Sequence, residues 1–99
     1  MPQEILSVAV WEPVPGLEAE SLATIRELIG VLSSKGYSRD HLYRDGESHY
    51  VLLRYWKSGH TRLTAQEDPD IQRCWAKLGH QIQIVKVYEQ LEGVPLEKP

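Results

Sequence analysis

The sequence predicts an α+β fold of the split βαβ type, with helices on one face of a four-stranded antiparallel sheet. The apolar and polar patterns follow the order strand, helix, strand, strand, helix, strand. The two most apolar strands are the first and the third, and this arrangement places those two in the middle of the sheet. A chain of 99 residues has room for a single hydrophobic core. Together these observations indicate one ferredoxin-like domain over residues 1–99, with a core from about 5 to 91 and a loose tail over 92–99.

The first half of the pattern is a buried strand followed by an amphipathic helix. Residues 5–11 are almost all apolar and predict a strand, which Pro13, Pro15 and Gly16 end. Residues 17–35 predict a helix that stops at Gly36. Its apolar positions recur at steps of three and four: Leu22, Ile25, Ile29 and Leu32.

The second half predicts a hairpin, two helices and a last strand. Residues 37–43 are polar enough for an edge strand, and Asp45-Gly46 is typical of a tight hairpin turn before a strand over 49–56. A short helix through residue 67 follows, and Asp68-Pro69 predicts the start of another helix that ends at Gly79. One face of that helix carries Ile71, Cys74, Trp75 and Leu78. Residues 82–91 predict the last strand.

Both faces of the central strands are apolar, although the helices can cover only one. Leu6, Val8 and Val10 alternate with Ile5, Ala9 and Trp11, and residues 50–56 alternate in the same way. A sheet with one solvated face normally alternates apolar and polar residues. We therefore expect a homodimer packed sheet on sheet, with Tyr55 and Trp11 on the dimer side.

Composition excludes several classes of protein. The net charge is −3 and the pI is near 5.8, which argues against nucleic-acid binding. No apolar run approaches the roughly 18 residues of a membrane span, so we expect no membrane partner. The start Met-Pro-Gln-Glu lacks the features of a signal peptide, and the single cysteine, Cys74, fits a reducing compartment. We therefore expect a cytoplasmic protein.

The segment Leu52-Leu53-Arg54-Tyr55-Trp56-Lys57-Ser58 resembles the third strand of the antibiotic biosynthesis monooxygenase (ABM) family. That strand ends in Trp, a variable residue and Ser, and here a Tyr-Arg-Asp-Gly hairpin precedes it and Asp68-Pro69 follows it. The resemblance extends from about residue 8 to residue 91. It implies a dimeric α/β barrel with a small-molecule pocket between the sheet and the helices of each subunit.

The resemblance has gaps that bear on the reaction. Oxygenase members of the family place an Asn four residues before the strand-end Trp, and this chain has Leu52 there. Haem-degrading relatives need an Asn, a Trp and a His, which fall near Trp11, Ala65 and Trp75 without a match. Haem degradation is therefore not expected.

Five residues are candidates for the site. Tyr50, Leu52, Arg54 and Trp56 share one face of the strand, and the match of Trp56 turns that face toward the helices. Arg54 is either a catalytic anchor for an anionic substrate or one half of a salt bridge, to a helix carboxylate such as Glu20 or Glu27 or to the partner chain of the dimer. The remaining candidates are Trp56, Trp75 and Tyr50 for substrate binding and His60 as a catalytic base at the pocket mouth.

Two hypotheses of function follow. The first is a cofactor-independent monooxygenase of a small phenolic or quinol-like molecule, with no cofactor and no metal. The second is a non-catalytic dimeric ligand-binding or stress-response module of the same fold. The tryptophans either line a ligand site or fill the core, and the sequence leaves both readings open.

Overall fold

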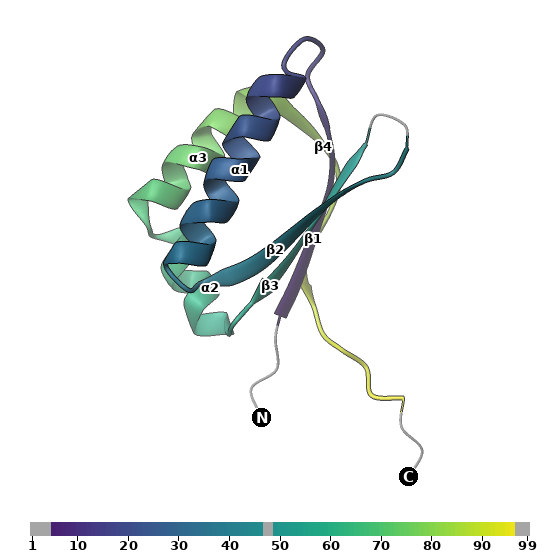
Figure 1. Cartoon of the computed structure of the whole chain (residues 1–99). Helices are drawn as coiled ribbons and strands as arrows, with labels where there is room; N and C mark the ends of the chain where they lie inside the picture. The colour runs from purple at the N-terminus through teal and green to yellow at the C-terminus, as the bar shows by residue number, and fades with distance from the viewer. Residues whose placement is uncertain (1–4, 47–48, 97–99) are drawn as a thin grey trace.

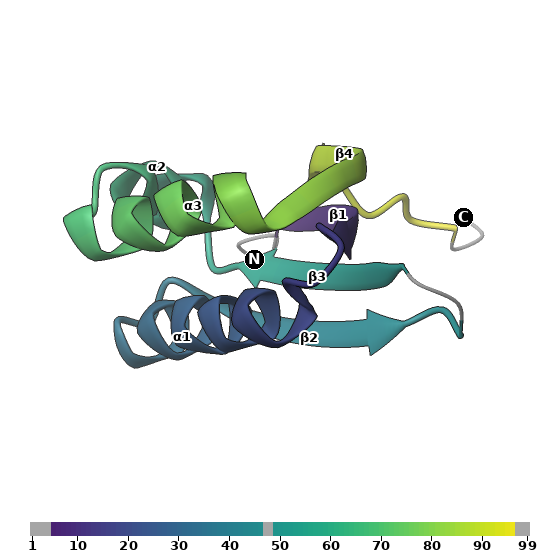
Figure 2. The ribbon, with the colours of Figure 1, turned by 90° about the horizontal axis from the view of Figure 1, so that it is seen from above.

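The computed structural model, which describes residues 5–46 and 49–96, contains one four-stranded antiparallel sheet and three helices. The strands lie in the order β2-β3-β1-β4, and all three helices lie on one side of the sheet (Figures 1 and 2). Along the chain the elements are β1 (Ile5–Pro13), α1 (Glu18–Ser34), β2 (Ser38–Arg44), β3 (Tyr50–Trp56), α2 (Gly59–Gln66), α3 (Pro69–Gln81) and β4 (Ile82–Leu91). This arrangement confirms the predicted α+β, ferredoxin-like fold, with the first and third strands in the centre.

The predicted signals at helix ends hold at two places and fail at one. Gly36 takes a positive φ of 72° directly after α1, a conformation that glycine adopts without steric cost. Asp68 caps α3, and Pro69 occupies its first turn. The prediction that α3 ends at Gly79 is wrong, because Gly79 does not take a positive φ and the helix continues to Gln81.

The hairpin predicted at Asp45-Gly46 forms, but the positive φ expected at both of these positions is present at Gly46 alone among the two. Arg44 pairs with Tyr50, so the connection between β2 and β3 comprises residues 45–49. Gly46 has a φ of 91°, but Asp45 does not have the positive φ that a type I′ turn requires. Glu47 and Ser48, which complete this connection, lie outside the described residues, as do residues 1–4 and residues 97–99 of the predicted tail.

The core lies between the sheet and the helices. The register of β1 on β3 pairs Trp11 with Tyr50 and Ile5 with Trp56, which places these four side chains on the helix-facing side of the sheet. The Trp11 ring is 1% exposed and stacks on the Tyr50 ring at 4.7 Å between centroids. The prediction that Trp11 lies on the dimer side is therefore wrong. Pairing of β1 with β3 places the Trp11 side chain on the helix-facing side of the sheet.

The opposite face of the sheet is covered by none of the helices in residues 5–46 and 49–96. Val8 and Leu53 pair at its centre, and half-buried apolar side chains surround them. Toward the outer strands, Tyr43 is 55% exposed and Tyr88 is 45% exposed. We call this surface the outer face; its apolar members in the two central strands are Leu6, Val8, Val10, Val51, Leu53 and Tyr55.

Candidate functional site

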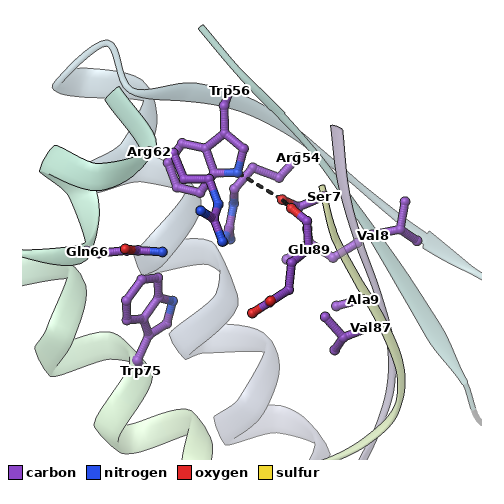
Figure 3. A pocket seen from close by; sticks show the side chains of 11 residues that line it. Ser7, Val8, Ala9, Arg54, Trp56, Arg62, Gln66, Trp75, Val87 and Glu89 are labelled. Carbon is purple, nitrogen blue, oxygen red and sulfur yellow. Dashed lines mark hydrogen bonds between the residues drawn. The ribbon is translucent and has the colours of Figure 1, made fainter. Parts of the chain in front are cut away.

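A cleft with two adjoining lobes lies between the sheet and the helices α2 and α3. Four residues line both lobes: Ala9, Leu52, Arg54 and Trp75. The first lobe, about 490 Å³, is completed by Ser7, Trp56, Arg62, Gln66, Val87 and Glu89, and Val8 borders it although its side chain points away from the cleft (Figure 3). The second lobe, about 370 Å³, is completed by Trp11, Ile25, Leu28, Leu78, Gly79, Ile82 and Ile84. Each volume lies in the range of small-molecule sites.

The local structure of each element explains which side chains reach the cleft. Alternation along β3 points Leu52, Arg54 and Trp56 to the helices, as predicted. On α2, Arg62 and Gln66 are four residues apart and so share one face. The cleft is open beside β4, where Ile84 and Val87 line its wall although they are 55% and 45% exposed.

Arg54 forms a buried ion pair with a strand residue. Its Nε donates to Asp40 Oδ2 at 2.7 Å, and the two side chains are 11% and 1% exposed. Asp40 lies opposite Arg54 on β2, and its other oxygen accepts a hydrogen bond from Ser38. The proposed partners Glu20 and Glu27 are therefore not the residues that pair with Arg54.

The rest of the Arg54 guanidinium has no such partner among the described residues. Its Nη2 is buried and makes no hydrogen bond. Its central carbon lies 5.4 Å from the centre of the Trp56 ring, within the distance of a cation–π contact. A buried donor without a partner costs free energy, and an acceptor supplied by a ligand would remove that cost.

The two tryptophans of the predicted site line the first lobe in different ways. The Trp56 Nε1 donates to Ser7 Oγ at 2.9 Å, and Ser7 Oγ donates to the Glu89 carbonyl at 2.6 Å. Since its N–H is already used, Trp56 offers its ring as a wall. Trp75 is half-buried on α3 and lies across the first lobe from Trp56 (Figure 3).

Tyr50 does not line either lobe. Its hydroxyl donates to the Glu18 carboxylate at the start of α1, and this hydrogen bond raises the pKa of the tyrosine. Arg44 lies 3.6 Å from the same carboxylate. The structure therefore places Tyr50 in a contact between the sheet and α1, away from the cleft where the sequence predicted it.

His60 is not brought into the cleft either. It is exposed at the start of α2 and lines neither lobe. The residues that sequence reasoning missed are Ser7, Arg62, Gln66 and Glu89. The spacing of Arg62 and Gln66 on the predicted short helix could have shown that both side chains share one face. The position of Glu89 in the cleft depends on the register of β4 on β1, which the sequence does not give.

Within residues 5–46 and 49–96, no three His, Cys, Asp or Glu side chains come together in a way that could hold a metal ion. None of the described helices has both the length and the apolar character needed to span a membrane.

Comparisons with known proteins give matches among solved structures alone. No protein-family model matches the chain, and no curated protein matches it. SnoaB, a cofactor-independent oxygenase from Streptomyces nogalater, is similar with a TM-score of 0.74 and 16% identity over 94% of this chain and 98% of SnoaB. A candidate antibiotic biosynthesis monooxygenase from Chloroflexus aurantiacus is similar with a TM-score of 0.70 and 17% identity over 97% of this chain and 96% of the other.

A third structure extends the likeness at still lower identity. A protein of unknown function from Bacteroides thetaiotaomicron is similar with a TM-score of 0.81 and 7% identity, over 94% of this chain and 100% of the other. At sequence identities this low, a structural match shows a shared fold and does not show a shared reaction. The chain therefore has the fold of the antibiotic biosynthesis monooxygenase-like proteins, which its Trp56-Lys57-Ser58 strand end resembles.

Proposed function

We propose that the protein is a cofactor-independent monooxygenase of a small phenolic or quinol-like molecule that binds in the cleft. The observation that carries the proposal is the position of Arg54, which lines both lobes beside Trp75 and is only partly used by Asp40. A guanidinium in this position stabilises a phenolate by charge and by hydrogen bonding. The fold shared with SnoaB supports oxygenation as the reaction.

The reaction needs little beyond a shielded site and a stabilised anion. The phenol loses a proton, and Arg54 holds the resulting oxyanion. The electron-rich ring then passes an electron to O₂, and the two radicals combine to a hydroperoxide. Loss of water from the carbon that carries the hydroperoxide converts a ring C–H to C=O, so one oxygen atom enters the product, the other leaves in water, and the substrate supplies all four electrons. Glu89 is the carboxylate that lines the first lobe, and we assign proton acceptance to it.

Oxygen uptake tests this proposal. With a panel of phenols and quinols and with a chelator present, we expect uptake that requires the protein but no added metal or flavin. Arg54→Gln should lower kcat by about 100-fold, the effect of losing one donor to a developing oxyanion. Trp56→Phe keeps a ring in the wall and should change kcat only a few-fold.

Two controls separate chemistry from folding. Arg26→Gln removes the same charge from an exposed position on α1 that lines neither lobe, so uptake should stay unchanged. Arg54→Lys retains a cation for the buried Asp40 and should keep the native circular dichroism spectrum while uptake falls. Uptake in Arg54→Gln equal to that of the wild type contradicts the assignment.

A non-catalytic ligand-binding or stress-response module is the second candidate. Two observations favour it: the predicted base His60 lines neither lobe, and Leu52 stands where oxygenase members of the resembled family have Asn. For such a module, calorimetry detects binding of a phenol from the panel, and the oxygen electrode detects no uptake with any member of it.

We also propose that the protein forms a homodimer through the outer face. This face is apolar in both central strands, and none of the described helices covers it. A second copy packed sheet on sheet would remove that apolar area from water.

A further inference from the structure

Two arginines from different elements line the first lobe. Arg54 comes from β3 and Arg62 from α2, and both side chains point into the space between Trp56 and Trp75 (Figure 3). Arg62 is half-buried, and no described carboxylate lies within ion-pair distance of it. Its planar set of N–H donors is therefore available inside the cleft.

The acidic side chains near these two arginines leave N–H donors of both guanidinium groups without an acceptor. Asp40 binds Arg54 through Nε and lies outside the lining of the lobe. Glu89 lines the lobe but is exposed, and it does not pair with Arg62. The lobe thus has donors on two guanidinium groups that an anionic ligand could satisfy.

The second lobe has the opposite character. Apart from Arg54 at its junction with the first lobe, its wall is built from aliphatic side chains, two tryptophans and a glycine. Trp75 lines both lobes, so a flat ring lying against it would extend from one lobe to the other. This division selects a molecule with a polar, acidic end and an apolar, aromatic body.

We infer that the substrate is a hydroxylated aromatic carboxylate whose carboxylate binds Arg62. The phenolate oxygen binds Arg54, and the ring system extends along Trp75 into the second lobe. The phenolic part of this inference rests on the proposed function, whereas the carboxylate part depends on Arg62 and the shape of the cleft.

Calorimetry with three matched probes tests the inference. The probes are 3-hydroxy-2-naphthoate, its primary carboxamide and 2-naphthol, which share the ring and the hydroxyl. The wild type should bind the acid about 10-fold or more tightly than the amide or the naphthol, since a charge-assisted pair is worth at least that factor. Arg62→Gln should remove this preference and leave the affinity for 2-naphthol unchanged.

Matched variants make the result specific. Arg62→Lys keeps the charge and should retain part of the preference, and Arg26→Gln should retain all of it. Equal binding of acid and amide by the wild type, no binding of the acid, or an unchanged preference in Arg62→Gln overturns the inference.

Failure of the inference can be told apart from failure of the proposed function. If the acid binds through Arg62 but no probe supports oxygen uptake, the oxygenase proposal fails and the carboxylate site stands. If 2-naphthol and the amide are oxygenated as well as the acid is, the oxygenase proposal stands and the carboxylate inference fails.

Discussion

Asp68 accepts hydrogen bonds from three groups, two of them at the end of α1 and one in the first turn of α3. Its carboxylate receives the Lys35 ammonium at 2.7 Å, the Tyr37 hydroxyl at 2.7 Å and the Asp70 backbone N–H at 2.9 Å. The hydrogen bond from Lys35, followed by that from Tyr37, lowers the pKa of Asp68 from 3.8 to about 2. The same contacts raise the pKa of Lys35 and of Tyr37. One side chain thus caps α3 and connects it to the end of α1.

This cluster predicts a loss of stability in acid. The pKa of Asp68 is lower in the folded chain, so between about pH 4 and pH 2 the unfolded chain binds more protons. The contribution is complete above pH 4 and disappears as the pH falls through 2. Asp68→Asn should lower the melting temperature at pH 7 by about 5 °C and weaken its pH dependence below 4.

Melting curves at several pH values between 2 and 7 measure this effect. Glu27→Gln is the control, because Glu27 is an exposed partner of Lys77 outside the cluster. If the Asp68→Asn curve parallels that of the wild type throughout, the cluster does not contribute as described.

At the same scale, the sequence predicts local contacts better than distant ones. Asp68-Pro69 was assigned to a helix start because a cap involves residues next to it in the chain. The partner of Arg54 was predicted wrongly because Asp40 faces it only through the register of β2 on β3. Tyr50 points away from the cleft for a similar reason, since Glu18 lies 32 residues earlier in the chain.

Among the elements, α2 is short and supplies two residues of the cleft. It begins with a capping box: Ser58 Oγ accepts from the Thr61 N–H at 3.1 Å, and Thr61 Oγ1 accepts from the Ser58 N–H at 3.1 Å. A helix of 8 residues has little stability of its own, so this cap matters more here than in α1.

Ser58→Ala should therefore destabilise the chain by about 1 kcal/mol and weaken ligand binding in the first lobe. The binding effect arises because Arg62 and Gln66 are held by the same helix. Urea unfolding and calorimetry with 3-hydroxy-2-naphthoate measure the two parts. Ser34→Ala, at the exposed end of α1, should change neither.

Element types were predicted more successfully than element ends. Apolar patterns predicted β1, α1, β3 and α3, each of which buries side chains in the core. The end of α3 and the backbone conformation of Asp45 in the hairpin were predicted wrongly because Gly79 and Asp45 could each adopt more than one backbone conformation. Packing of the whole chain selects between such conformations, and a short sequence window does not contain that information.

For the whole molecule, the outer face is an apolar surface that none of the described helices covers. Leu53 lies at its centre, opposite Val8. We expect a mass of twice 11.4 kDa in solution, and Leu53→Lys should reduce it to that of a monomer by placing a charge in the interface.

Light scattering at micromolar concentration measures the mass. Leu63→Lys is the control, since Leu63 is 58% exposed on the helix side. A monomeric wild type would refute the proposed dimer.

The apolar alternation that predicts this face is clear in the sequence, but the sequence did not show that Trp11 belongs to the helix-facing side of the sheet.

The placement of the three tryptophans has a practical consequence. Trp56 lines the first lobe, Trp11 lines the second, and Trp75 lines both, so every indole of the chain borders the cleft. No tryptophan elsewhere adds a constant background to the ultraviolet emission of the protein. Intrinsic fluorescence is therefore a label-free optical report on whether the cleft is occupied.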